Sequence, residues 1–145
     1  MASNVQTRSL SDLTSARRGA LIAYRWLLLA FLLAGAAQIF LAGLGVFSIT
    51  SHGASTDSAF GPHRSLGFTM AGAAVIILIL ALIARPGALP LALAGVLVVQ
   101  TGLLQSLLAG LADNAALYGG LHALDGLLAL GNAGFLYATA RRWRS

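Results

Sequence analysis

The sequence predicts an all-α protein, an integral membrane four-helix bundle made of two repeated helical hairpins. Three observations predict this fold. Hydrophobic residues make up 58% of the 145 residues and charged residues only 9%, which is typical of a membrane protein rather than of a soluble core. The apolar residues form four long runs separated by short polar turns. A pattern that contains Gln, Leu, Ala, Gly and His also occurs twice in the chain.

The composition excludes several classes of function. Cysteine is absent, which removes disulfides, thiolate metal sites and thiol catalysis. The net charge is +5, but the arginines that carry it lie at the ends of the apolar runs and form no continuous face. They therefore indicate membrane topology, with the lipid bilayer and not nucleic acid as the partner. No catalytic triad, carboxylate pair or phosphate loop supports a hydrolase or a kinase.

The first 19 residues differ in composition from the rest of the chain. Residues 1–19 are polar and carry three arginines, so we interpret them as a cytoplasmic tail, and residues 20–145 as a four-helix transmembrane domain. The first apolar run predicts a helix over about 21–49. Within it, Ala34-Gly35-Ala36 loosely resembles a signal-peptidase site, so a cleaved signal peptide is an alternative to a first span.

Three further helices follow in order. The second is predicted over about 61–84, with Pro62 suited to its first turn and Arg85-Pro86-Gly87 ending it. The third is predicted over about 89–112, up to an Asp-Asn turn, and the fourth over about 116–140, before the basic carboxyl terminus. Each is long enough to cross a bilayer, which takes about 20 residues.

The distribution of arginines predicts the orientation. Arg64 alone falls on one side of the predicted spans, and the other eight arginines fall on the opposite side. Because cytoplasmic loops carry the excess of basic residues, both termini are predicted to be cytoplasmic. The protein is therefore expected to be a multi-pass protein of the cell (inner or plasma) membrane.

An internal repeat relates the two halves of the chain. Residues 38–45 read QIFLAGLG and residues 105–112 read QSLLAGLA. Each copy is followed by His-x-x-x-Gly, as His63 with Gly67 and as His122 with Gly126. Because the polar Gln and His residues fall in phase, we interpret the chain as two helical hairpins related by a pseudo-twofold axis along the membrane normal.

The two repeated histidines form a candidate cofactor site. They lie 22 and 19 residues before the arginines that end their helices, a difference of about one helical turn in depth at about 1.5 Å per residue. The glycine four residues after each histidine shares its helix face and would let a flat macrocycle approach. Two neutral imidazoles saturate haem iron, which favours electron transfer over oxygen binding. The sequence therefore predicts one haem near the outer face, with His63 and His122 as its axial metal ligands.

Simpler interpretations stand beside this one. A histidine at a membrane boundary is commonly an interfacial polar residue, and Gly-x-x-x-small spacing is commonly helix packing; the matched pair favours a cofactor. Arg64 could pair with a haem propionate or reach lipid phosphate. Gln38 and Gln105 are expected to form interhelical hydrogen bonds, with lining of the cofactor pocket as the alternative. Asp125 is expected to pair with Arg64 or an imidazole N–H, and His52 to be solvated in a loop.

These residues resemble a known family. The motif His63-Arg64-x-x-Gly67, the Gln-containing first and third helices and a second histidine opening the fourth helix resemble one four-helix half of heme A synthase. The resemblance covers the chain from the first helix onward and implies the half that holds haem b, with His63 and His122 as ligands and Arg64 beside them. The chain also resembles small four-span membrane proteins of actinobacterial type, to which the resemblance assigns no role.

The departures from that family narrow the expected activity. In its catalytic half a glutamate stands three residues before the first histidine and a cysteine pair lies in the first outer loop. Phe60 takes the place of the glutamate here, and cysteine is absent. The resemblance therefore implies that haem b is held without oxidation of its methyl group.

The sequence as a whole predicts a membrane b-type cytochrome that transfers single electrons. As an enzyme it would be at most a quinol- or haem-linked oxidoreductase. Its candidate partners are a quinol, another redox protein and a second copy in a homo-oligomer. Two alternatives are a haem-binding or haem-transfer protein without redox turnover, and a structural four-span subunit.

Overall fold

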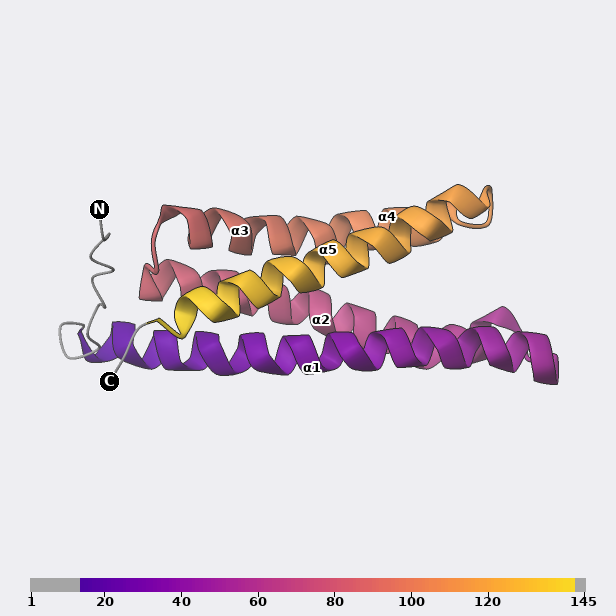
Figure 1. Cartoon of the computed structure of the whole chain (residues 1–145), viewed down its shortest axis with the longest axis horizontal. Helices are drawn as coiled ribbons and strands as arrows, with labels where there is room; N and C mark the ends of the chain where they lie inside the picture. The colour runs from indigo at the N-terminus through magenta and orange to yellow at the C-terminus, as the bar shows by residue number, and fades with distance from the viewer. Residues whose placement is uncertain (1–13, 143–145) are drawn as a thin grey trace, which may run out of the picture.

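The computed structural model describes residues 14–142, which form helices joined by short turns (Figure 1). The helices are α1 (Ser15–His52), α2 (Thr56–Ala84), α3 (Ala88–Val98), the π-helical segment η2 (Val99–Leu104), α4 (Gln105–Leu111) and α5 (Ala116–Ala140). Because α3, η2 and α4 follow one another without a break, they form one rod, and the described chain has four helices and no strand. The prediction of an all-α fold with four helices is confirmed.

Helix α1 begins before the predicted residue 21. The Thr14 side chain accepts a hydrogen bond from the backbone N–H of Arg17 at 3.4 Å, which caps the helix and lets it start at Ser15. Residues 15–19, predicted as part of a polar tail, therefore belong to α1. Residues 1–13 of that predicted tail lie outside the described residues.

Helix α1 also extends beyond its predicted end. It ends at His52 because Gly53 adopts a left-handed conformation, with φ at 63°, and its N–H bonds back to the carbonyl of Ile49 at 3.1 Å. His52, predicted to lie in a loop, is the last residue of the helix and is exposed.

Helix α2 begins at Thr56, five residues before its predicted start. The Ser55 hydroxyl accepts a hydrogen bond from the N–H of Ser58 at 3.3 Å, and Asp57 places an acidic side chain in the first turn. Pro62 therefore lies inside the helix and not in its first turn as predicted. The sequence did not predict this start, because the first turn of α2 is polar and lies outside the apolar run.

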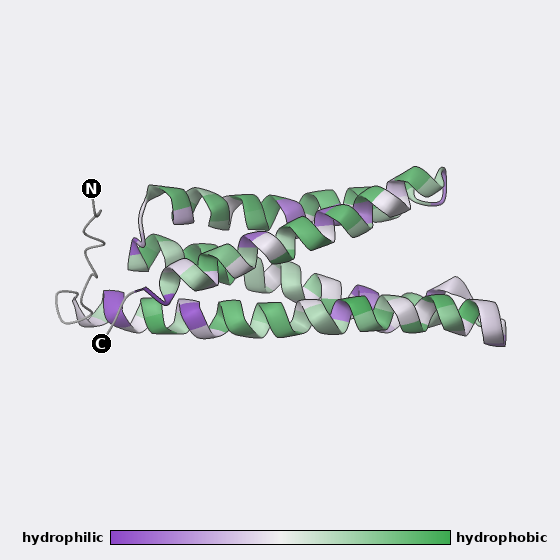
Figure 2. Ribbon diagram, in the orientation of Figure 1, coloured by the Kyte–Doolittle hydropathy of each residue, from purple (hydrophilic) through white to green (hydrophobic). Residues whose placement is uncertain are grey.

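Three helices are long and apolar enough to cross a membrane: α1, α2 and the rod Ala88–Leu111. Helix α5 is not among them, because His122, Asp125 and Asn132 lower its mean hydropathy. Apolar residues make up most of the four helices (Figure 2). Large ones are widely exposed, for example Trp26 at 68% and Phe68 at 69%, which suits contact with lipid chains.

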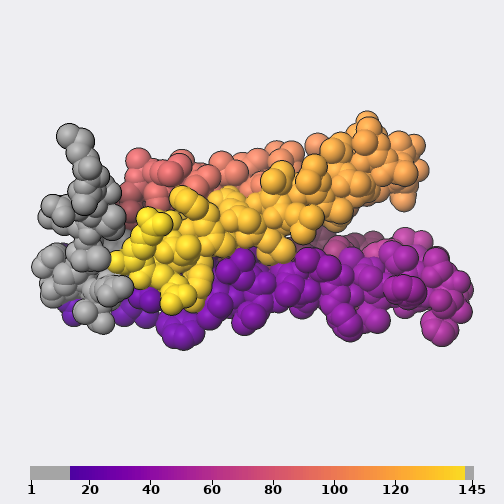
Figure 3. Space-filling view, in the orientation of Figure 1, coloured from indigo at the N-terminus to yellow at the C-terminus, as the bar shows by residue number. Residues whose placement is uncertain are grey.

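The helices pack most closely at the end that carries Arg17, Arg25, Arg85 and Arg141, which we call the Arg-rich end. Helix α1 begins there and α2 ends there, and α5 crosses the bundle diagonally to finish beside the start of α1 (Figure 1). The residues that are buried toward this end include Leu21, Tyr24, Leu28, Ile77, Ala81, Ala84, Leu136 and Ala140. The opposite end, which we call the outer end, is where the pair α1 and α2 and the pair α4 and α5 diverge (Figure 3).

Candidate functional site

Four polar residues with matching positions in the two copies of the repeat meet near the outer end. His63 lies in α2 and contacts Gln38 of α1, and His122 lies in α5 and contacts Gln105 of α4. All four side chains are half-buried. The long helices bring together residues that are 25 and 17 positions apart in sequence.

The hydrogen bond of each histidine defines its tautomer. His63 Nδ1 lies 3.1 Å from the backbone oxygen of Gln38, and His122 Nδ1 lies 3.1 Å from the backbone oxygen of Gln105. A carbonyl oxygen can only accept, so Nδ1–H is the donor in both rings. In the neutral imidazole this leaves the lone pair on Nε2, the arrangement found when a histidine binds a metal through Nε2.

The two imidazoles also lie against each other. The ring centroids of His63 and His122 are 6.1 Å apart, with an angle of 63° between the ring planes. Phe60 packs edge-on against His63, with ring centroids 6.1 Å apart and an angle of 79°. Phe60 in turn fits against Gly45 of α1, where an added Cβ would come within 2.7 Å of the phenyl ring. The imidazole of His63 is therefore held by a hydrogen bond to the backbone oxygen of Gln38 and by contact with the Phe60 ring.

The repeated glycines lie beside the glutamine side chains. A Cβ on Gly67 would be 3.1 Å from Nε2 of Gln38, and a Cβ on Gly126 would be 3.6 Å from Nε2 of Gln105. The neighbour of each glycine in this structure is therefore the amide of the repeated glutamine, in the space that the sequence assigned to a flat macrocycle.

The two glutamine amides have different partners. Gln105 Nε2 donates to the backbone oxygen of His122 at 2.8 Å and to Oδ2 of Asp125 at 2.9 Å. Asp125 is 8% exposed, so this bond satisfies a buried carboxyl group. Leu66 takes the position of Asp125 in the first copy, and Oε1 of Gln38 is buried without a hydrogen-bond partner.

Two predicted partners of Asp125 are wrong. Arg64 forms an ion pair with Asp57 at 2.9 Å, seven residues earlier in α2, and also donates to the Asp57 backbone oxygen at 3.3 Å. The imidazole N–H groups bond to backbone oxygens. Asp125 is instead held by Gln105, an interhelical hydrogen bond that the sequence predicted for Gln105 without naming its partner.

A second buried polar contact lies outside this cluster and was not predicted. Asn132 of α5 donates from Nδ2 to the backbone oxygen of Leu93 at 3.0 Å and to Oε1 of Gln100 at 3.2 Å. Gln100 lies in the π-helical segment and is 9% exposed. These two residues have no repeated counterparts, since Ala73 and Leu33 take the matching positions. A polar amide inside an apolar run was the only sequence signal that could have indicated them.

The two imidazoles offer two donor atoms to a metal. Within residues 14–142, no group of three or more His, Cys, Asp or Glu side chains is placed to hold a metal ion. Two imidazoles with free Nε2 atoms match instead the two axial positions of an iron whose other four positions a porphyrin fills. The structure is open between the two helix pairs at this end (Figure 3). The two imidazoles therefore suit the axial positions of a haem, whereas the amides of Gln38 and Gln105 occupy the space beside Gly67 and Gly126 that the sequence assigned to the macrocycle.

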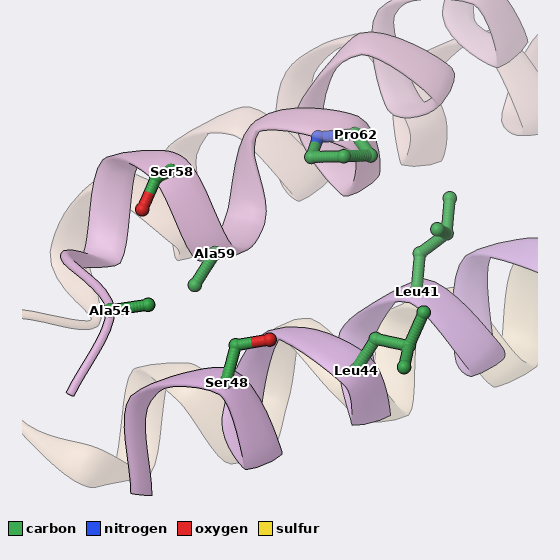
Figure 4. Close-up of a pocket in the computed structure, with 7 residues that line it drawn as sticks. All are labelled: Leu41, Leu44, Ser48, Ala54, Ser58, Ala59 and Pro62. Carbon is green, nitrogen blue, oxygen red and sulfur yellow. The ribbon is translucent and has the colours of Figure 1, made fainter. Parts of the chain in front are cut away.

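One pocket lies next to this cluster and is distinct from it. It has a volume of about 240 Å³ and lies between the outer ends of α1 and α2 (Figure 4). Its walls are mostly small or apolar side chains: Leu41, Leu44, Ser48, Ala54, Ser58, Ala59 and Pro62. Typical cofactor sites occupy about 300–1,000 Å³, so this pocket is too small for a haem.

Comparisons with protein families, with curated proteins and with solved structures find no match to the chain.

Proposed function

We propose that the protein is a membrane b-type cytochrome in which His63 and His122 are the axial ligands of one haem b. The observation that carries the proposal is the 6.1 Å separation of the two imidazole centroids, together with an Nδ1–H hydrogen bond that leaves Nε2 free on each ring. The two ligands come from α2 and α5, as in bundle proteins that build a cofactor site from facing helices.

The separation agrees with ligation on two sides of one metal. A metal–imidazole bond is about 2.0–2.1 Å, and about 1 Å separates the nitrogen from its ring centre, so two axial rings have centroids about 6 Å apart. The centroids of His63 and His122 are 6.1 Å apart before any ligand is considered.

The repeat supports a site with two equivalent halves. The same contact, from histidine Nδ1–H to the backbone oxygen of the repeated glutamine, occurs at 3.1 Å in both copies. This supports the interpretation of α1–α2 and of α3–α5 as two hairpins related by a pseudo-twofold axis along the membrane normal. A ligand between the hairpins would then meet the same groups on both of its faces.

The proposed topology has four spans, with α5 as the fourth and both termini in the cytoplasm. Three apolar helices support the spans, and the described arginines other than Arg64 gather at the Arg-rich end, which would face the cytoplasm. The histidines lie near the opposite end, so the haem would be close to the extracytoplasmic face. Proteins of this kind belong to the cell (inner or plasma) membrane.

The protein's own residues would orient the ligands and limit their chemistry. A haem with two histidine ligands supplies one-electron transfer and has no open coordination position. The carbonyls of Gln38 and Gln105 would fix the ring orientations and raise the basicity of both imidazoles. Phe60, where the resembling enzyme family has a glutamate, places an apolar ring against His63, which supports holding the haem without modifying it.

A second candidate, haem transfer without redox turnover, is favoured by the open outer end between the helix pairs (Figure 3). A redox titration separates the two candidates. An electron-transfer protein should cycle between its oxidised and reduced forms and accept electrons from a quinol. A transfer protein should instead lose haem to an acceptor such as apomyoglobin within minutes.

Both candidate functions require that His63 and His122 bind one haem. Titration of haem-free protein with ferric haem b tests this binding. We expect the absorption change to end at one haem per chain and to show a six-coordinate spectrum. His63→Ala and His122→Ala should each abolish that spectrum, whereas His52→Ala, at an exposed helix end, should leave it unchanged. Equal binding by all three variants would contradict the proposal.

A further inference from the structure

A second concave site lies at the Arg-rich end, between the first turns of α1 and the last turns of α5. This pocket has a volume of about 160 Å³ and is lined by Ile22, Arg25, Trp26 and Tyr137. Arg141 lies over the Tyr137 ring, with its guanidinium carbon 5.7 Å from the ring centroid. Two arginines from different helices therefore approach the same aromatic side chain.

The described carboxylates cannot neutralise these arginines. Asp57, Asp113 and Asp125 all lie in the outer half of the molecule. Asp57 already pairs with Arg64, and Asp125 accepts from Gln105. Arg25, which lines the pocket, and Arg141, which lies over the Tyr137 ring of its wall, therefore have none of these three carboxylates near them.

The position of Arg25 along α1 increases the need for an anion. Arg17 donates to the backbone oxygen of Ala84 at 3.3 and 3.4 Å, which aligns that turn of α1 with the end of α2. Arg25 lies eight residues further along α1, about 12 Å deeper into the bundle. It is half-buried beside Trp26, and a guanidinium at the boundary between headgroups and hydrocarbon needs an anion or water as its partner.

An apolar track leads away from the pocket along α1. Trp26, Leu33, Phe40 and Phe47 are exposed by 68%, 66%, 66% and 68%. Because they are seven residues apart, they lie along one side of the helix. The track is about 30 Å long, close to the thickness of the hydrocarbon layer, so an acyl chain of one leaflet would cover about half of it, beginning at Trp26.

We propose that this pocket binds the phosphate headgroup of an anionic phospholipid, between Arg25 and Arg141, with an acyl chain along the apolar track of α1. Arginine forms forked hydrogen bonds that suit phosphate oxygens, and Trp26 and Tyr137 provide the aromatic walls expected at the level of headgroups. The continuous apolar track favours a lipid over a free phosphate ion. The inference rests on the proposal that α1 crosses a bilayer and is independent of haem.

Quenching of Trp26 fluorescence by brominated lipids tests this site. The chain has two tryptophans, so Trp143→Phe leaves Trp26 as the reporter. The protein would be placed in nanodiscs that contain equal mole fractions of brominated phosphatidylglycerol or brominated phosphatidylcholine in matched unbrominated lipid. We expect stronger quenching by phosphatidylglycerol. Arg25→Gln and Arg141→Gln should each lower this preference about fivefold, since one arginine contributes about that factor to binding of an anionic lipid.

Arg85→Gln is the matched control, because Arg85 is an exposed arginine at the same end and does not line the pocket. It should keep the lipid preference of the parent protein. Equal quenching by the two lipids, or equal losses in Arg85→Gln and Arg25→Gln, would overturn the proposal. A shift of Trp26 emission by inorganic phosphate in detergent, with no lipid preference, would overturn it in favour of an ion site. Quenching by neither lipid would show instead that α1 is not in the bilayer.

Discussion

The imidazole rings of His63 and His122 lie with their centroids 6.1 Å apart, although the two residues belong to different copies of an internal repeat. Each ring donates through Nδ1–H to the backbone oxygen of the glutamine in its own copy, at 3.1 Å in both cases. The pair therefore has matched tautomers and free Nε2 atoms. These features make it the strongest candidate site in the described chain.

The two repeated glutamines should differ in their contribution to stability. Gln105→Leu removes the hydrogen bond to buried Asp125 and should lower the free energy of unfolding of the haem-free protein by about 1–3 kcal/mol. Gln38→Leu removes an amide whose buried Oε1 has no partner, so its cost should be smaller. Unfolding in mixed detergent would measure both values. A loss in Gln38→Leu as large as that in Gln105→Leu would contradict the observed pairing.

The contact between α1 and α5 depends on Gly35. A Cβ at this position would collide with the side chain of Leu130, so Gly35→Ala should destabilise the protein by about 1–3 kcal/mol through overpacking. Gly43→Ala, on the same helix with open space around it, should instead stabilise by up to about 1 kcal/mol, because alanine is the better helix former. Thermal unfolding of both variants in one detergent measures the difference. Equal effects would mean that α5 does not pack on α1 at Gly35.

The ion pair of Arg64 with Asp57 should contribute little to stability or to haem binding. Its side chains are 52% and 91% exposed, and exposed pairs contribute less than about 1 kcal/mol. Because the guanidinium is bound to Asp57, Arg64→Gln and Asp57→Asn should both retain the parent haem content, measured per chain by absorbance. A loss of haem in Arg64→Gln alone would assign Arg64 to a haem propionate, the alternative that the sequence raised.

Most of the predictions about the helices and the candidate site came from periodic features of the sequence. Four apolar runs predicted four helices, and these are observed because each run is long and bounded by turn residues. The in-phase Gln and His residues pointed to the positions that make equal contacts in the two copies. Both predictions depended on spacing along one helix, which a sequence records directly.

Contacts between helices were harder to predict, because rotation and depth are set by packing that no single helix encodes. Asp125 was assigned to Arg64 or to an imidazole, whereas the relative rotation of α4 and α5 places it beside Gln105. Gln100 and Asn132 were missed for the same reason, since their contact also depends on a π-helical segment. The early start of α2 was missed because Ser55 caps a turn of polar residues.

The visible absorption spectrum of detergent-purified protein from haem-replete cells reports directly whether His63 and His122 bind haem. Ligation of haem by both histidines predicts sharp bands of six-coordinate haem in the reduced protein, lost in His63→Ala and in His122→Ala and kept in His52→Ala. A colourless parent protein, or reduced-state bands that persist in both site variants, would contradict the assignment of these two histidines as axial ligands.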